Sequence, residues 1–380
     1  MNTETKIHLR RKFKEYYWNH QVGAPSEVHR REFGVGTLED KIKFRHKAFA
    51  TERELNQYLK TEAPYYISYS AAYYEFPKQP MAEKNWLGAD LIFDLDKPMS
   101  LLNEEKLEEV KEEATTLLEF LEGDFGFSRK DISVNFSGGK GYHIHVSSDD
   151  VKSLNGDGRR EIADYVSGAG LDITYFLSEV EGFKGFTFKR GKVQASSGSF
   201  IGPRKDSRGW AGRVYAVTEK LVNSPVEELL LLDGIGRKTA EKIAASRERN
   251  MKLLAEGKWD ALFSLFGKNI QKQIYSKAVE VTDEDKQVTL DTSRLIRLPD
   301  TIHGGSGLIA KKVADLGKFN PLVDALAFRG GESKVRMSAD VGVFQIGGKD
   351  YGPYKAGLEA EVEECAAVYL MLKGLADVKG

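Results

Sequence analysis

The chain has 380 residues, of which 41% are hydrophobic and 30% charged, as expected of a globular protein with a large core. Its formal net charge of −1 excludes a strong overall positive field, so any surface for nucleic acid must be a local basic patch. A single cysteine excludes an internal disulfide and a cysteine-based zinc site, and no apolar run reaches the roughly 18 residues of a membrane-spanning helix.

A buried strand that ends in two carboxylates is predicted at residues 88–96, GADLIFDLD. Side chains alternate across a strand, so Asp94 and Asp96 point to one face, roughly 6.6 Å apart. That spacing lets both bind one divalent ion, or a pair of ions about 3.5–4 Å apart, as in two-metal phosphoryl-transfer sites. Asp90 shares this face but lies roughly 13 Å from Asp94, so we expect it outside the cluster. Taken alone, the pattern favours a simpler alternative, a strand that runs into an acidic, solvated turn.

A helix and a second strand follow the acidic strand. The helix is predicted over residues 103–121, because Asn103 is a good N-cap and apolar residues recur after it at helical spacing. Residues 131–136 are predicted to form the strand. Strand, helix and strand in this order predict a βαβ unit with parallel strands and a right-handed crossover.

The second strand leads into a glycine-rich turn, residues 137–141, on a strand that should neighbour the acidic one. Its glycines let the backbone approach a ligand, and exposed N–H groups of such a turn can hold phosphate. Lys140 adds a point charge and Ser137 a hydroxyl. His143 and His145 share one face of the next strand, but no third soft ligand is nearby, so zinc is not expected there. A hairpin turn with a polar outer face is the alternative.

A helical insertion is predicted at residues 211–277. Within it, Ser224-Pro-Val-Glu227 has the pattern of a capping box with proline at the first helical position. Residues 233–243 resemble a helix-hairpin-helix, whose glycine turn presents backbone N–H groups to a DNA phosphate while basic side chains add salt-sensitive attraction. The residues expected to contact DNA are Gly234, Gly236, Arg237 and Lys238. An ordinary helical hairpin that packs the insertion fits the pattern equally well.

A further polar group lies at residues 285–308. Asp285 and Asp291 precede Arg297, and His303 follows among glycines that leave it room. The arginine and the histidine can neutralise phosphate oxygens, and one acid can complete a three-carboxylate metal site. Surface ion pairs and a turn histidine are the alternative. Near the end of the chain, apolar residues from Leu358 onward recur at helical spacing and predict a docked helix.

Three of these segments, in their order and wording, resemble the catalytic small subunit of archaeal and eukaryotic DNA primases, the archaeal type more closely. They are FDLD at 93–96, SGGKGYHIHV at 137–146 and RLIRLPxxxHGGSGL at 294–308. Shorter matches lie at residues 30–33, 44–49 and 64–69, and the resemblance spans about residues 10–310.

The resemblance implies a DNA-directed RNA polymerase of the primase type, which joins nucleotides on a single-stranded DNA template and begins without a primer. By the same resemblance, Asp94, Asp96 and Asp285 would bind two Mg²⁺ or Mn²⁺ ions, with Asp291 as the second choice for the third acid. The nucleotide-binding residues would be Ser137, Gly139, Lys140, His143, Arg297, His303 and Arg45. A repair or end-joining polymerase of the same superfamily is the alternative.

The implied fold is α/β (α+β), a primase catalytic core with an RRM-like sheet. Residues 1–210 and 278–350 would form the core, residues 211–277 the insertion and residues 351–380 the docked C-terminal helix. Many members of the family carry a Cys/His zinc knuckle after the acidic strand. Residues 97–130 contain neither residue type, so no structural zinc is expected.

The implied partners are a large primase subunit in a heterodimer, single-stranded DNA, nucleoside triphosphates and other proteins of DNA replication. The basic N-terminus lacks the apolar stretch of a signal peptide. We therefore expect a cytoplasmic protein that makes no membrane contact.

Overall fold

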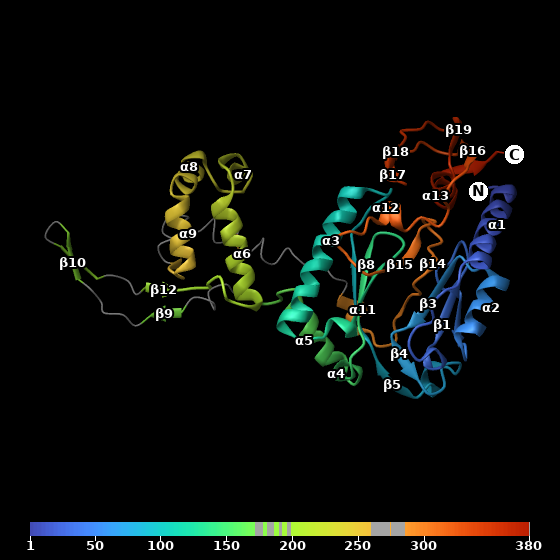
Figure 1. Ribbon diagram of the computed structural model, residues 1–380, viewed down its shortest axis with the longest axis horizontal. Coiled ribbons are helices and arrows are strands. Elements are labelled where there is room, and N and C mark those ends of the chain that lie inside the picture. Colours follow the sequence, from blue (N-terminus) through green and yellow to red (C-terminus); the bar gives the residue numbers. More distant parts are fainter. Residues whose placement is uncertain are drawn as a thin grey trace. The chain divides into compact units, whose positions relative to one another are not determined.

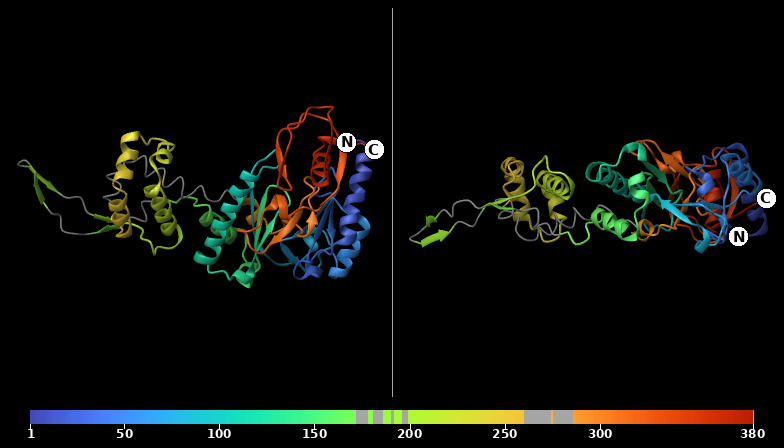
Figure 2. Two further views of the ribbon diagram at one scale, coloured as in Figure 1. Left: turned by 45° about the horizontal axis from the view of Figure 1, so that its top comes forward. Right: turned by 90° about the horizontal axis from the view of Figure 1, so that it is seen from below.

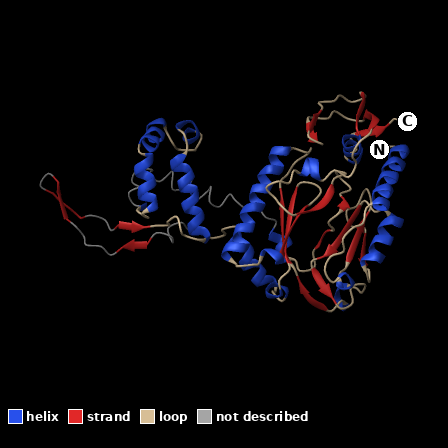
Figure 3. Ribbon diagram, in the orientation of Figure 1, coloured by secondary structure: helices blue, strands red, loops and turns tan. Residues whose placement is uncertain are grey.

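The computed structural model describes residues 1–171, 178–180, 186–189, 192–195, 199–259, 274 and 286–379. Helices and antiparallel sheets are mixed along the chain (Figure 3), which confirms the predicted α+β class. The chain divides into two compact units. The first consists of Met1–Leu118, Phe127–Ala163 and Asp283–Gly380, and the second of Glu119–Gly126 and Asp164–Thr282.

The largest sheet of the first unit has five strands in the order β14-β15-β7-β8-β6. Their bounds are Leu91–Asp96 for β6, Ile132–Phe136 for β7, Gly141–Val146 for β8, Thr301–Ile302 for β14 and Ile309–Val313 for β15. Each pairs antiparallel with its neighbours. Strands β6 and β7 therefore run parallel, as the βαβ pattern predicts, but β8 lies between them. The neighbour of the acidic strand is the strand after the glycine turn.

A second sheet of this unit has four antiparallel strands in the order β13-β3-β1-β2. Their bounds are Phe33–Gly36 for β1, Phe44–Lys47 for β2, Tyr66–Ser70 for β3 and Leu295–Arg297 for β13. Helices α1 (Thr3–Asn19) and α2 (Glu52–Glu62) pack against each other beside this sheet (Figure 1). Strand β14 of the five-stranded sheet contacts β3, so the two sheets are neighbours.

The predicted acidic strand at 88–96 is broken at Asp90. Strand β5 (Trp86–Ala89) pairs antiparallel with β4 (Ala72–Tyr74), and β6 starts only at Leu91. The following helix, α3 (Glu104–Glu119), begins as predicted, because Asn103 Oδ1 accepts the N–H of Lys106 at 2.8 Å. Two short helices, α4 (Asp149–Lys152) and α5 (Gly156–Val166), follow β8.

The C-terminal region is more varied than the predicted helix at 351–380. Its elements are α12 (Pro321–Asp324), β16 (Glu332–Met337), β17 (Phe344–Ile346), β18 (Lys349–Tyr351), β19 (Glu359–Glu363), α13 (Glu364–Leu372) and β20 (Ala376–Val378). The helix begins only at Glu364, because the preceding residues pair with β16 as a strand. The alternating sequence Glu-Ala-Glu-Val-Glu is itself a strand signal. The two chain ends lie close together (Figure 2), and Asn2 N donates to Asp377 Oδ1 at 2.8 Å.

The second unit contains a small helical core. Its helices are α6 (Gly209–Asn223), α7 (Val226–Leu230), α8 (Arg237–Ala245) and α9 (Arg247–Ala255). Their buried residues include Val214, Leu221, Leu229, Ile243 and Leu254. Strands β9 (Ser178–Val180) and β12 (Ser199–Ile201) pair with each other, as do β10 (Phe186–Lys189) and β11 (Lys192–Ala195).

The predicted capping box at 224–227 is wrong. The N-cap of α7 is Pro225, and the hydroxyl of Ser224 donates backwards to the Lys220 carbonyl of α6 at 3.2 Å. The serine thus ends one helix and does not begin the next.

Among the helices that the structure describes, none combines the length and the apolar character needed to span a bilayer.

Candidate functional site

A cavity of about 500 Å³ in the first unit is lined by residues of both sheets. Asp94 and Asp96 come from β6, and His143 comes from β8. On the other sheet, Ser68 of β3 and Arg297 of β13 are directly paired and both reach the same cavity. Residues that are distant in the sequence therefore meet in one space.

The acidic wall of the cavity depends on the pairing of β6 with β8. Asp94 lies opposite His143, and Asp96 lies opposite Gly141. The Nε2 atom of His143 is 3.4 Å from Asp94 Oδ1. A side chain at position 141 would overlap the Leu95 carbonyl oxygen, so glycine is needed for β8 to reach the end of the acidic strand.

His143 and His145 are both buried and lie on the same face of β8. His145 Nδ1 lies 3.3 Å from the Tyr69 hydroxyl. The pKa of both His143 and His145 is lowered to about 3. Burial is the largest cause for both; nearby arginines contribute for His143, and His143 contributes for His145. At neutral pH the histidine beside Asp94 therefore carries no charge.

Acid should destabilise this arrangement. The unfolded chain takes up protons on His143 and His145 near the ordinary pKa of 6.5, whereas the folded chain does so only near 3. The free energy of unfolding should be highest above pH 6.5, and it should fall as the pH drops from 6.5 toward 3. Urea unfolding at pH 7 and 4.5 measures this decline. In His145→Asn the decline should be smaller, and an equal decline in both proteins would contradict the assignment.

The glycine turn before β8 is organised by its serine. Ser137 Oγ accepts the N–H groups of Gly139, Lys140 and Gly141 at 3.3, 3.3 and 3.2 Å. These N–H groups are directed to the serine inside the turn, whereas we expected them to be free for a phosphate. The groups that the turn offers to a ligand are the Ser137 hydroxyl hydrogen and the ammonium of Lys140, whose residue lines the cavity.

His303 packs directly against this turn. Gly138 has a positive φ of 78°, and a Cβ there would lie 2.8 Å from His303 Cβ. The Nδ1 atom of His303 accepts the N–H of Gly305 at 3.2 Å. Burial lowers the pKa of His303 well below its ordinary value, and the charge of Arg297 lowers it further. The neutral ring therefore carries its hydrogen on Nε2, where it can donate to an anion in the cavity.

Arg297 provides the clearest sign of an anion site. Its guanidinium lies over the Tyr66 ring, 4.9 Å from the ring centroid. The Nη1 atom is buried and has no hydrogen-bond partner among the described residues. Burial lowers the pKa of this group to about 10, so it remains charged at neutral pH. A buried charged donor without a partner is costly, and a phosphate oxygen would satisfy it.

Arg45 also lines the cavity, but a protein carboxylate already holds it. Its Nε and Nη2 atoms donate to the two carboxylate oxygens of buried Glu32 at 3.0 and 3.1 Å. This fork fixes the guanidinium and neutralises much of its charge. Arg45 is therefore a weaker candidate for a phosphate contact than Arg297.

The predicted metal site has two candidates for its third acid, Asp285 and Asp291. Asp285 lies outside the described residues. Helix α11 (Lys286–Leu290) begins immediately after it and packs against β6, where Thr289 Oγ1 donates to the Ile92 carbonyl at 2.8 Å. Asp291 lines the cavity, and its Oδ1 accepts the N–H and hydroxyl of Ser293 at 2.9 and 2.7 Å. The described residues contain no cluster of three or more His, Cys, Asp or Glu side chains that could hold a metal ion.

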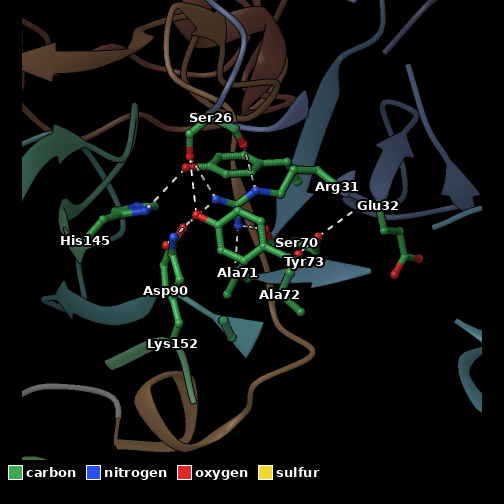
Figure 4. Close-up of polar contacts among 12 residues, drawn as sticks. Ser26, Arg31, Glu32, Ser70, Ala71, Ala72, Tyr73, Asp90, His145 and Lys152 are labelled. Atoms are coloured by element: carbon green, nitrogen blue, oxygen red, sulfur yellow. Dashed lines mark hydrogen bonds and ion pairs between the residues drawn. The ribbon is translucent and has the colours of Figure 1, made fainter. Parts of the chain in front are cut away.

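A buried ion pair joins the segment before β1 to the residue between β5 and β6 (Figure 4). Arg31 Nη2 lies 2.6 Å from Asp90 Oδ2, and both side chains are almost fully buried. The Tyr73 hydroxyl donates to Asp90 Oδ1 at 2.8 Å, and Arg31 Nη1 donates to the carbonyls of Ser70 and Ala71 at 2.9 and 2.7 Å. Asp90 does not line the cavity, and it acts here as a structural counter-charge.

Comparisons with known proteins identify the family. The family model of the DNA primase small subunit matches residues 93–315. The chain is 37% identical to the DNA primase small subunit PriS of Methanococcoides burtonii, over 99% of both chains. It is 36% identical to PriS of Methanothrix thermoacetophila over all of both chains, and 33% identical to PriS of Haloarcula marismortui over 99% of both.

The chain belongs to the DNA primase small subunit family. This confirms the predicted family and the predicted function as a primase catalytic subunit. The comparisons do not favour the repair or end-joining alternative.

For this primase small subunit, the structure brings all but one of the predicted metal and nucleotide residues to one cavity. Those that line it are Asp94, Asp96, Ser137, Gly139, Lys140, His143, Arg297, His303 and Arg45. Sequence reasoning missed Lys41, Ser68 and Lys373. Lys41 lies close to the matched segment at 44–49, and Ser68 lies within that at 64–69. Lys373 lies beyond the region of resemblance, so no motif pointed to it.

Proposed function

We propose that the chain synthesises short RNA primers on single-stranded DNA by nucleotidyl transfer in this cavity. The observation that carries the proposal is that acidic and anion-binding side chains line different walls of the same cavity. Carboxylates of β6 form one wall, while the buried Nη1 of Arg297 and the neutral His303 form another. Such a site suits a triphosphate that needs metal ligands on one side and anion donors on the other.

Asp94 and Asp96, with Asp285 or Asp291, would hold two Mg²⁺ or Mn²⁺ ions. Their oxygen ligands suit these hard cations. When bound, such ions make the attacking 3′-hydroxyl more acidic and stabilise the charge that develops at the α-phosphate. Arg297, His303 and Lys140 would orient the triphosphate and the leaving pyrophosphate. No side chain needs to act as a covalent nucleophile.

We also infer that the five-stranded sheet, with its β6-α3-β7-β8 order, is the RRM-like sheet of a primase core. The core would comprise residues 1–210 and 278–350, with residues 211–277 as an insertion and the end of the chain docked on it. Because the relatives are named small subunits, we propose a heterodimer with a large primase subunit. We propose that it acts in the cytoplasm, on replicating DNA and together with other replication proteins.

The insertion is proposed to hold DNA without base specificity. Helix α8 begins at Arg237, and its N-cap Gly236 provides no side-chain hydrogen bond. The preceding Gly234 has a positive φ of 76°, a left-handed backbone conformation that glycine adopts readily in a tight turn. Lys238 lies in the first turn of α8. These features support a backbone contact with a phosphate group.

The double substitution Arg237→Gln and Lys238→Gln tests the insertion. It should lower the affinity for single-stranded DNA and reduce the slope of log affinity against log salt by about 1.4, or about 0.7 per lost phosphate contact. Fluorescence anisotropy across a salt series measures the slope. The matched control is Arg249→Gln with Lys252→Gln on α9, which should keep the slope of the unaltered protein. An unchanged slope in the α8 variant would refute DNA binding by this insertion.

An unprimed synthesis assay tests the proposed function as a whole. The protein is incubated with single-stranded DNA and either ribo- or deoxynucleotides, with Mg²⁺ or Mn²⁺, and with and without the large subunit. We expect dinucleotides and short oligonucleotides in the absence of any primer. Synthesis only from pre-existing ends would instead indicate a repair-type polymerase.

A further inference from the structure

Three lysines from distant parts of the chain meet at the cavity. Lys41 precedes β2, Lys140 belongs to the glycine turn, and Lys373 follows α13 near the end of the chain. None of them forms an ion pair within the part of the chain that the structure describes. Other lysines of the C-terminal region do so: Lys349 with Glu363, Lys355 with Asp340 and Lys379 with Glu359. Lys373 Nζ lies 5.6 Å from the centroid of the Tyr369 ring, and no described carboxylate pairs with any of the three cavity lysines, so an external anion can bind them.

The charges of these lysines act on one another and on His303. Partial burial lowers the pKa of the Lys373 ammonium, and the charges of Lys140 and Lys41 lower it further. Burial and Arg297 are the larger causes of the lowered pKa of His303, and Lys41 and Lys373 add to them. Positive charge is therefore concentrated on the side of the cavity next to His303. A polyphosphate placed there would relieve this repulsion.

Helix α13 connects the two walls of the cavity. The Tyr369 hydroxyl accepts the N–H of Leu102 at 2.9 Å, in the segment that follows the acidic strand. On another side, a Cβ at Gly307 would lie 3.0 Å from Val368 Cγ1, so the turn after His303 packs directly against the helix. The helix thus touches segments that belong to both the acidic wall and the anion-binding wall.

The position of Lys373 is fixed by the end of this helix. Its N–H donates to the Tyr369 carbonyl at 3.0 Å, and Gly374, with a φ of 69°, turns the chain out of the helix. Leu375 N donates back to the Leu370 carbonyl at 2.9 Å, and β20 then pairs with β16. The backbone of Lys373 is therefore held from both sides, and its side chain is directed to the cavity.

The backbone of Lys41 is held in a comparable way. Gly36 lies so close to the carbonyl oxygens of Asp40 and Lys41 that no Cβ would fit there. The neighbouring Ile42 packs over Gly34, where a Cβ would lie 3.2 Å from Ile42 Cγ2. The connection between β1 and β2 thus packs closely against the sheet at the edge of the cavity. This packing fixes the backbone position of Lys41.

We propose that Lys373, together with Lys41, binds the β- and γ-phosphates of the incoming nucleoside triphosphate, so that the C-terminal segment is part of the nucleotide site. This inference rests on the proposed function and adds two residues to its site. The two ammonium groups add positive charge to the wall that holds Arg297 and His303, on the side away from the carboxylates of β6.

The test measures the affinity of the full-length protein for ATP and for AMP by calorimetry. Lys373→Gln should weaken ATP binding by about tenfold or more, the usual effect of losing a charge-assisted hydrogen bond, and leave AMP binding unchanged. Lys373→Arg should restore most of the ATP affinity. Lys379→Gln, six residues further along and outside the cavity, should bind both nucleotides like the unaltered protein.

The outcomes separate this inference from the proposed function. If the unaltered protein binds ATP no better than AMP, the proposed function itself fails. If the unaltered protein prefers ATP and Lys373→Gln keeps that preference, the role of Lys373 is refuted. Equal loss of ATP and AMP binding would mean a structural role and would also refute it. Should Lys373→Gln not fold, Lys41→Gln gives the same test from an independent segment.

Discussion

Asp94→Asn and Asp96→Asn should each lower primer synthesis by about 10³-fold or more while template binding stays in place. Both carboxylates belong to the acidic wall of the cavity, and asparagine keeps their size but removes the charge that a divalent ion needs. Metal ions contribute several kcal/mol of transition-state stabilisation, which corresponds to an effect of this size. The loss of charge should therefore lower the rate of synthesis far more than the affinity for DNA.

Two assays on the same preparations check this result. Unprimed synthesis is followed with labelled nucleotides, and affinity for single-stranded DNA is followed by anisotropy. The matched control is Asp350→Asn on β18, an exposed carboxylate outside the cavity, which should leave both unchanged. Full synthesis by either cavity variant would rule out the metal site, and loss of template binding would indicate damage to the fold.

Asp90→Asn should cost about 3–5 kcal/mol of unfolding free energy, because it leaves the buried charge of Arg31 without a counter-charge. Asparagine fills the same space, so the effect reports on charge more than on packing. Arg31 also binds the carbonyls of Ser70 and Ala71, so its displacement would disturb the end of β3. Strand β3 carries Ser68 and Tyr66 to the cavity region, so loss of stability should be accompanied by weaker nucleotide binding.

Urea unfolding at neutral pH measures the cost. The control is Asp40→Asn, which affects an exposed pair with Lys43 at 3.7 Å and should change stability by less than about 1 kcal/mol. If Asp90→Asn were as mild as Asp40→Asn, the buried pair would not be the structural support that we describe.

Local patterns in the sequence predicted the parts of the site that depend on local structure. Alternation along a strand placed Asp94 and Asp96 on one face, and the N-cap preference of Asn103 located the start of α3. The order of the three motifs indicated the family. None of these inferences required knowledge of which distant segments pack together.

Predictions that depended on tertiary pairing were less accurate. The order of β6, β8 and β7 follows from the short turn between β7 and β8, which makes them a hairpin and leaves the other edge of β8 for the acidic strand. The N–H groups of the glycine turn, which we expected to be free for phosphate, are directed to Ser137 Oγ at 3.2–3.3 Å. Residues 359–363 are a strand because β16 offers an edge, which helical spacing could not reveal.

Lys373 shows the same limit most clearly. It lies 70 residues after His303 in the sequence, in a region without any motif, and reaches the cavity only because α13 packs on the turn after that histidine. A sequence pattern cannot indicate a residue whose place depends on how a distant helix docks.

The most direct test of the central claim is a crystal structure with Mn²⁺ and a non-hydrolysable nucleoside triphosphate. The anomalous signal of manganese should appear at the carboxylates of Asp94 and Asp96. The triphosphate should lie in the same cavity, with its outer phosphates beside Arg297 and His303. Manganese bound elsewhere, or a triphosphate outside this cavity, would contradict the account.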